Sequence, residues 1–275
     1  MKKFLTVVLA VIMSIACLAL TACGGDENTL YVYTNAGFAP YEYVNTKGEV
    51  VGVDIDIMKE IGEVLGYKVV INDIEFNQIL DEVQKNEFAI GAAGMTKTDE
   101  RDAIALPSIS YATSVQYVIV PTGTFDSDDL VDGKLNIAKL AELTNKAIGV
   151  QTGTTGDFMI TDAIDGYADD DGNHVTGDLE GMGMSYLGYT NAIVASGDIG
   201  NQIGAVVIDK LPAESICDSN SGLECIELNA QPESYVLYLN KNATQLLAKI
   251  NEVLEIMIEN GVINFYTLKH SGGIV

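Results

Sequence analysis

The sequence predicts an α/β fold with a largely parallel sheet covered by helices on both faces. Apolar runs with the two-residue period of strands alternate with segments that have the period of helices. Such alternation is typical of parallel sheets covered on both faces. A second strand-and-helix series follows a break near residue 112. The 275 residues suit one large domain or two smaller ones, with enough chain for sizeable cores.

The N-terminus precedes this fold. Met1–Lys3 is basic and Phe4–Leu20 is almost wholly apolar, so residues 1–22 are predicted to be a secretory signal peptide. Cys23 directly follows Leu-Thr-Ala, which resembles a bacterial lipobox and would make Cys23 the lipidated first residue of the mature protein. The alternatives are a plain secretory signal or an uncleaved anchor. A short polar tether, residues 23–29, leads into the fold.

The chain is strongly acidic, with a formal net charge of −24. Loss of Lys2 and Lys3 with the signal peptide removes two positive charges and takes this value to −26. Repulsion from phosphates excludes nucleic acid as a partner. After the signal peptide, no apolar run is long enough to span a bilayer.

Two cysteines remain once Cys17 and Cys23 are assigned to the N-terminus. Cys217 and Cys225 are eight residues apart, and outside the cytoplasm they can form a disulfide that closes a loop. The alternative is a pair of buried free thiols. No metal site is predicted, because the chain has only two histidines.

The first series places polar and aromatic residues just after predicted strand ends. Strands are expected at Leu30–Thr34, Lys68–Ile71 and Phe88–Ala92, a hairpin at Tyr43–Val53, and helices from Asp54 to Gly66 and at Phe76–Lys85. Asn35, Phe38, Phe76 and Thr96 follow these strands or begin these helices. Ligands of such sheets bind outside the carboxyl ends of the strands, so a binding site is expected there.

The segment 89–101 is the most informative part of this series. It starts as a buried strand, passes Gly94 and opens a helix, with Thr96 and Asp99 at capping-box spacing. Free N–H groups at a helix start attract a carboxylate or phosphate, and Arg101 can hold a carboxylate through two hydrogen bonds. The alternative is a capped surface helix with an exposed arginine.

The second series has the same organisation. Strands are expected at Ala112–Pro121, Ala147–Gln151, Gly204–Ile208 and Tyr235–Leu239, and helices at Ala243–Asn260 and Val262–Lys269. Thr152–Asp157 suits a helix N-terminus approached by an anion, although no Gly-Lys-Ser/Thr follows as in a phosphate-binding loop. Asp209 follows a buried strand and is either a simple N-cap or a site residue.

The segment 165–185 is an acidic insert. Asp169, Asp171, Asn173 and Glu180 have calcium-loop spacing, but His174 replaces the required glycine. A solvated surface loop is the favoured interpretation.

Five motifs in order resemble the extracytoplasmic solute-binding proteins of polar amino-acid ABC importers. The resemblance covers residues 30–270 and rests on Phe38–Tyr43, Gly52–Ile57, Ala93–Arg101, Gly149–Thr155 and Ile208–Asp209. It implies the type II periplasmic-binding-protein fold, with lobe 1 at 30–112 and 232–275 and lobe 2 at 113–231. Two hinge strands would cross near Tyr111–Gln116 and Leu228–Ser234.

The resemblance also implies a function. The protein would bind an amino acid outside the membrane, close its lobes around it and deliver it to ABC permease subunits. It would be a monomer anchored through lipid on Cys23, without a cofactor and without enzymatic activity.

Site roles transfer by resemblance to matching positions. Arg101, Thr96 and Thr155 would hold the ligand α-carboxylate, and Asp209 with the Gly94 carbonyl would hold the α-ammonium. Phe38 and Phe76 would flank the ligand side chain. A zwitterion that leaves water needs both charges paired, which agrees with these roles.

Some features depart from the family pattern. The chain has no tryptophan, although family members often have one near Phe76. Asn35, where the family selects on side-chain charge, replaces an acid found in several binders of basic amino acids, which makes a cationic ligand less favoured. The rival functions are a cyclohexadienyl dehydratase-like enzyme, with Glu42 or Glu100 as acid or base, and a sensory lipoprotein.

Overall fold

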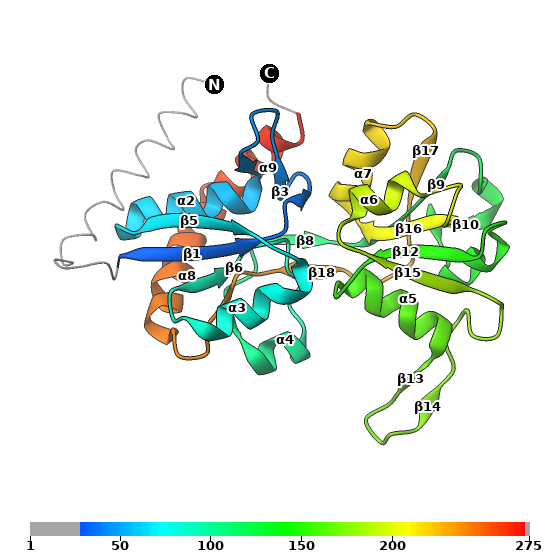
Figure 1. Cartoon of the computed structure of the whole chain (residues 1–275), viewed down its shortest axis with the longest axis horizontal. Coiled ribbons are helices and arrows are strands. Elements are labelled where there is room, and N and C mark those ends of the chain that lie inside the picture. The colour runs from blue at the N-terminus through cyan, green and yellow to red at the C-terminus, as the bar shows by residue number, and fades with distance from the viewer. Residues whose placement is uncertain (1–27, 273–275) are drawn as a thin grey trace. The chain divides into compact units, whose positions relative to one another are not determined.

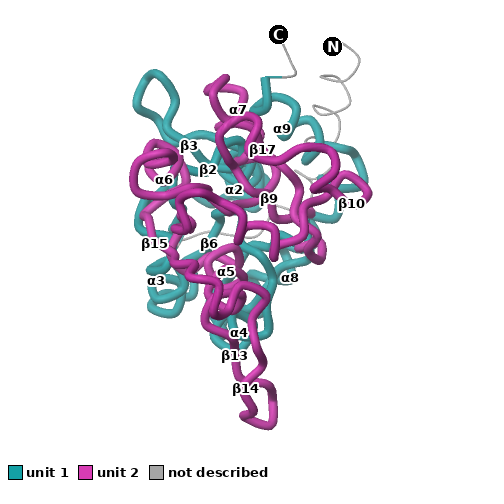
Figure 2. Tube along the Cα trace, turned by 90° about the vertical axis from the view of Figure 1, so that its right-hand side faces the viewer, with its two compact units in different colours: residues 1–112, 234–275 teal, residues 113–233 magenta. Residues whose placement is uncertain are grey.

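The structure is a computed structural model that describes residues 28–272. The predicted signal peptide, Cys23 and most of the tether lie outside the described residues. The described chain divides into two compact units, coloured separately in Figure 2. Unit 1 contains residues up to Ala112 and from Ser234 onward, and unit 2 contains Thr113–Glu233. The predicted α/β class is confirmed in both units.

The described part of unit 1 contains a five-stranded sheet in the order β5-β1-β6-β19-β7. β1 runs parallel to β5 and β6, whereas β19 runs antiparallel to β6 and β7. The strands are β1 (Thr29–Thr34), β5 (Lys68–Asp73), β6 (Ala89–Gly91), β7 (Leu106–Pro107) and β19 (Tyr238–Leu239). A separate small sheet is made by β2 (Gly37–Phe38), β3 (Glu42–Val44) and β4 (Val50–Val51).

The helices of unit 1 follow the apolar periodicity of the sequence and flank its sheet (Figure 1). They are α2 (Val53–Leu65), the 3-10 turn η2 (Phe76–Gln78), α3 (Ile79–Lys85), α4 (Asp99–Ile104), α8 (Thr244–Glu259) and α9 (Val262–His270). α2 ends at Gly66, which adopts the left-handed conformation with φ 75°. The predicted helix at Phe76–Lys85 is therefore a 3-10 turn followed by a shorter α-helix.

The described part of unit 2 contains a sheet of the same plan, in the order β15-β12-β16-β9-β17. β12 is parallel to β15 and β16, and β9 is antiparallel to β16 and β17. The strands are β9 (Gln116–Pro121), β12 (Ala147–Gln151), β15 (Ser185–Tyr189), β16 (Ala205–Asp209) and β17 (Leu223–Glu227). The helices are α5 (Thr155–Asp165), α6 (Ala192–Gly197) and α7 (Lys210–Asp218). Apolar side chains such as Val118, Ile148, Val150 and Val207 form its core.

Two predicted strands are each broken into two. Ala112–Pro121 divides into β8 (Ala112–Ser114) and β9, and Tyr235–Leu239 divides into β18 (Glu233–Tyr235) and β19. β8 and β18 pair in a two-stranded sheet that contains both points where the chain passes between units. After each crossing the chain enters the sheet of the next unit as its antiparallel fourth strand.

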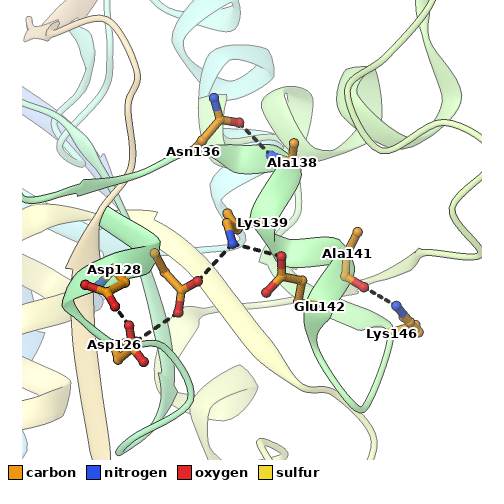
Figure 3. A network of polar contacts seen from close by, with 9 residues as sticks. Asp126, Asp128, Asn136, Ala138, Lys139, Ala141, Glu142 and Lys146 are labelled. Atoms are coloured by element: carbon orange, nitrogen blue, oxygen red, sulfur yellow. Dashed lines mark hydrogen bonds and ion pairs between the residues drawn. The ribbon is translucent and has the colours of Figure 1, made fainter. Parts of the chain in front are cut away.

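A network of polar contacts connects short segments of unit 2 (Figure 3). Two short strands, β10 (Leu130–Val131) and β11 (Lys134–Leu135), lie between the 3-10 turns η3 (Ser127–Asp129) and η4 (Ile137–Glu142). Lys139 bridges the two turns, with its ammonium 2.9 Å from both Asp129 and Glu142. Lys146 donates a hydrogen bond to the carbonyl of Ala141. These ion pairs are exposed, so they connect surface turns without adding much stability.

The acidic insert at 165–185 is not a plain loop. It contains the hairpin of β13 (Tyr167–Ala168) and β14 (His174–Val175), which projects beyond α5, and the start of β15 (Figure 1). The Asp169 carboxylate accepts hydrogen bonds from the N–H groups of Asp171 and Asn173, and Glu180 contacts His174. The carboxylates of Asp169 and Glu180 thus bond to other residues of the insert.

The C-terminal helix is attached to α2 by a small charged cluster. Asp56 accepts hydrogen bonds from Lys269 at 2.5 Å and His270 at 2.8 Å. Burial favours the neutral acid, but these two partners outweigh it and lower the pKa of Asp56. Within residues 28–272, no helix is long and apolar enough to cross a membrane.

Candidate functional site

Parallel strands bring three loops of unit 1 to one edge of its sheet. Thr34 pairs with Asp73, and Tyr33 pairs with Gly91, so β1, β5 and β6 end side by side. Asn35 follows β1, is 9% exposed, and donates from Nδ2 to the carbonyl of Ile74 at 2.7 Å. This bond joins the loop after β1 to the loop that leads into η2.

Arg101 lies in this region as a buried cation. Its side chain is 7% exposed, although it comes from a short helix, so the alternative of an exposed surface arginine is wrong. Nη1 donates to the carbonyl of Thr96 at 2.7 Å, and the guanidinium carbon lies 5.4 Å from the ring centre of Phe76. Three predicted site residues therefore meet, with the arginine fixed by a carbonyl and an aromatic face.

The start of α4 differs from the predicted capping box. The N-cap is Thr98, whose hydroxyl accepts from the N–H of Arg101 at 3.2 Å. Thr96 instead forms a β-bridge with Tyr235 and is 6% exposed. Thr96 is thus paired with Tyr235 in an isolated bridge between β6 and α4, and Thr98 caps the helix in its place.

Gly94 and Phe38 form a second close contact at this edge. Gly94 has φ 54°, and a Cβ atom added to it would lie 2.7 Å from a ring carbon of Phe38. Only glycine combines this left-handed backbone with so close an approach. Phe38 in β2 is 5% exposed and Phe76 is 8% exposed. Six predicted site residues are thus buried in unit 1. We call this group the cationic half-site: Asn35, Phe38, Phe76, Gly94, Thr96 and Arg101.

Asp54 was not predicted as a site residue, but it bonds to the loop that contains Gly94. Its side chain is fully buried, accepts the N–H of Gly94 at 2.8 Å, and accepts the Tyr111 hydroxyl at 2.7 Å. Burial raises the pKa of Asp54 to about 6, although both hydrogen bonds act in the opposite direction. Tyr111 directly precedes β8, so one carboxylate bonds both the site loop and the residue before the first crossing strand.

Unit 2 contains the other two predicted site residues. Thr155 is the first residue of α5, which follows β12, and Thr154 caps that helix by accepting from the N–H of Asp157. Asp209 ends β16 and is 4% exposed. It occupies the N-cap position of α7, but its side chain makes no capping hydrogen bond, so it is not a simple N-cap.

Two further residues of unit 2, Gln116 and Glu233, contact Thr155 or Asp209. We call these four residues the anionic half-site. Gln116 of β9 is 1% exposed and pairs in register with Asp209. Glu233 of β18 accepts from the Thr155 hydroxyl at 2.7 Å and from the Gln116 amide at 3.0 Å. Neither was predicted, because their significance depends on contacts between residues distant in sequence. A general signal existed, since both lie in the predicted crossing segments.

Cys217 in α7 and Cys225 in β17 are free thiols in the structure, so the disulfide is not formed there. The two thiols are hydrogen-bonded to each other, and burial raises the pKa of Cys217 to about 12. A thiol with such a pKa rarely becomes the thiolate that oxidation requires. Pairing of these two cysteines stays a prediction.

The described residues include no group of three or more His, Cys, Asp or Glu side chains arranged to hold a metal ion. What the two half-sites offer chemically is charge recognition. A buried guanidinium suits an anionic group, and the carboxylates of Asp209, which is buried, and Glu233, which is partly buried, suit a cationic one.

Comparison with known proteins places the chain in a family. The model of the bacterial extracellular solute-binding proteins, family 3, matches residues 30–272. The chain is 23% identical to the arginine-binding extracellular protein of Bacillus subtilis, over 95% of this chain and 94% of that protein. It is 32% identical to the probable histidine-binding protein of Neisseria gonorrhoeae, over 58% of this chain and 59% of that protein.

Solved structures give the same result. An ancestral arginine-binding protein bound to arginine superposes with a TM-score of 0.74 at 28% identity, covering 90% of this chain and 99% of that one. A shorter similarity, 26% identity over 36% of this chain and 42% of the relative, links it to the cyclohexadienyl dehydratase of Pseudomonas aeruginosa. The fold, the match over residues 30–272 and these relatives agree: the chain belongs to family 3 of the bacterial extracellular solute-binding proteins.

Proposed function

We propose that this protein binds a polar α-amino acid outside the membrane and delivers it to an ABC importer. The observation that carries this proposal is the environment of Arg101, a guanidinium only 7% exposed that lies against the Phe76 ring and the Thr96 carbonyl. A buried, preorganised guanidinium at the carboxyl edge of a parallel sheet suits a ligand carboxylate. The arginine- and histidine-binding relatives support the ligand class.

The two half-sites have complementary roles in this proposal. Arg101 and Thr96 take the α-carboxylate with help from Thr155, while Asp209 and the Gly94 carbonyl take the α-ammonium. Phe38, Phe76 and Asn35 contact the side chain. Because the opposite charges come from different units, a bound zwitterion satisfies both only when the units close on it. Ligand then shifts a hinge equilibrium toward closure.

A thermal-shift screen of the twenty amino acids and cystine tests the proposal. A true ligand at about 100 times its dissociation constant should stabilise the protein by about 2.7 kcal/mol. We expect a response to a polar amino acid. The arginine- and histidine-binding relatives make L-arginine and L-histidine the first to test, although Asn35 stands where several binders of basic amino acids have an acid. Lack of a response to any α-amino acid would contradict amino-acid binding altogether.

We infer a binding role without catalysis. Of the two carboxylates considered as acid or base, Glu100 is exposed on α4, whereas Glu42 is 1% exposed in β3. Glu42 is therefore the carboxylate to examine for a dehydratase, and its pairing opposite Phe38 favours that choice. Prephenate incubated with the purified protein should remain unchanged, and turnover that Glu42→Gln abolishes would revive the enzyme.

We also propose that Cys23 carries the lipid anchor and that the mature protein is monomeric. Replacement of Cys23 by Ser should move the protein from the membrane fraction to the soluble fraction, and the wild-type N-terminal peptide should show the added mass of acyl chains. A Cys23→Ser variant that stays in the membrane would indicate an uncleaved anchor. A permease and an ATPase gene beside this one would favour transport over sensing.

A further inference from the structure

In the anionic half-site, the Glu233 carboxylate contacts the Thr155 hydroxyl, which the proposed ligand carboxylate would also need. Its Oε2 atom lies 2.7 Å from the hydroxyl of Thr155, and its Oε1 atom lies 3.0 Å from the amide nitrogen of Gln116. Glu233 is the last residue of unit 2 and belongs to β18, and all three residues lie within that unit. The contacts are therefore internal to one compact part of the chain.

The direction of each hydrogen bond is fixed by chemistry. The Gln116 nitrogen can only donate, and it lies 3.0 Å from Glu233 and 3.4 Å from the Thr155 oxygen. Thr155 has a single hydroxyl hydrogen. Since the Glu233 carboxylate can only accept, that hydrogen is directed to Glu233 at 2.7 Å. The Thr155 hydroxyl is thus already bonded to a carboxylate.

In the proposed function, the hydroxyl hydrogen of Thr155 also bonds the carboxylate of the amino-acid ligand. One hydrogen cannot serve two carboxylates at full strength, and two anions that converge on one hydroxyl repel each other. A ligand carboxylate that bonds Thr155 therefore has to replace Glu233. Gln116 is fully enclosed in β9 and cannot follow Glu233 away, so the replacement moves the glutamate side chain or the β18 backbone that carries it.

We propose that Glu233 is a specificity-determining residue that competes with the ligand α-carboxylate for the Thr155 hydroxyl and so sets the affinity of the site. This inference rests on the proposed function. It also gives the crossing strand a role, because Glu233 stands immediately before the second crossing. Ligand binding exchanges a contact between α5 and β18 for a contact between α5 and the ligand.

Isothermal titration with L-arginine tests the competition. Glu233→Ala removes the competing acceptor and should tighten binding about 10-fold, the worth of one charge-assisted hydrogen bond. Glu233→Gln keeps the shape but removes the charge, and should tighten binding less. The gain should vanish when Thr155 is also replaced by Ala, so that the double variant binds like Thr155→Ala alone.

Glu224→Gln is the matched control. Glu224 lies in β17 of the same unit and accepts the N–H of Gly123 at 2.8 Å, so its loss should leave the affinity for arginine unchanged. Weaker binding by the Glu233 variants would show that Glu233 holds the ligand cation and would overturn the proposal. Unchanged binding would overturn it too, while the wild-type titration would still uphold amino-acid binding. No heat with L-arginine from wild type or any variant would overturn the competition for this ligand. Amino-acid binding itself would be contradicted only if the thermal-shift screen also gave no response.

Discussion

The two half-sites are built on the same sheet plan but have opposite charge. In unit 1, parallel strands bring a buried guanidinium and two aromatic rings to the sheet edge. In unit 2, the end of β16 supplies the Asp209 carboxylate and the crossing strand β18 supplies that of Glu233. Topology therefore supplies the place, and side chains supply the chemistry. A zwitterion is the kind of ligand that uses both halves, because each of its charges needs the opposite charge once water is removed.

The cationic half-site should be the more sensitive of the two. Arg101→Ala removes the guanidinium and strands the ligand carboxylate, so amino-acid affinity should fall by about 3–5 kcal/mol, which is several hundred-fold or more. Calorimetry measures this loss. Lys97→Ala is the control, because that exposed lysine pairs with Asp102 and its loss should leave affinity nearly unchanged. Equal effects of the two substitutions on affinity would show that Arg101 does not bind the ligand.

Asp209→Asn tests the anionic half-site in the same way. It removes the charge that takes the ligand ammonium but keeps the size of the side chain, and should weaken binding by about 2–4 kcal/mol. Asp218→Asn, at the end of the same helix α7, is the control. A variant that loses stability but keeps affinity would make Asp209 a structural residue.

The buried carboxylate of Asp54 should make the stability of the fold depend on pH. Its pKa is raised to about 6 from an ordinary value of 3.8, so the folded protein binds more protons than the unfolded chain between these values. The contribution of Asp54 therefore stabilises the fold below about pH 4 and is lost as pH rises to 6. The difference in unfolding free energy between wild type and Asp54→Asn should change by about 2 kcal/mol between pH 4 and pH 7.

Denaturant unfolding at both pH values measures this change, and Asp56→Asn is the contrasting variant. The pKa of Asp56 is lowered by its partners in α9, so its contribution has the opposite sign: it is present at neutral pH and lost on acidification. The two variants should therefore depend on pH in opposite directions. Parallel profiles would contradict the assigned surroundings of Asp54.

Gly94→Ala probes the packing of the cationic half-site and should have the smallest effect on stability. The new methyl group would meet the Phe38 ring and the backbone would be strained, at a cost of about 1–3 kcal/mol. Gly48→Ala carries similar strain at φ 79° but meets no atom within 4 Å, so it isolates the cost of the backbone conformation. Equal losses in thermal unfolding would mean that contact with Phe38 is unimportant.

Much of the fold could be predicted from the sequence because local patterns determine it. The apolar face of α8 and the glycine that ends α2 are local signals, and both predictions are confirmed. The crossing segments were predicted as unbroken strands because β-propensity continues through Val115 and Val236, whereas the breaks are set by partners far along the chain. β15 was missed because it is a partly exposed edge strand without clear alternation.

The candidate site also contains residues that local patterns predict and residues whose contacts depend on distant parts of the chain. The residues that follow strand ends carry recognisable local chemistry, and the structure gathers six of them in unit 1 and two in unit 2. Thr98, and not Thr96, caps α4 because Thr96 is held by its bridge to Tyr235, which lies far away in the sequence. Glu233 is 78 residues from Thr155, and Asp54 is 40 residues from Gly94. No local pattern encodes such contacts.

The most direct test asks whether the two charges of one ligand bind to the two half-sites. Calorimetry compares L-arginine with agmatine, which lacks the carboxylate, in wild type, Arg101→Ala and Asp209→Asn. If Arg101 holds the carboxylate, removal of that group should weaken binding to wild type and to Asp209→Asn but add little to the loss in Arg101→Ala. Full additivity between agmatine and Arg101→Ala would contradict the assignment of the carboxylate to the cationic half-site.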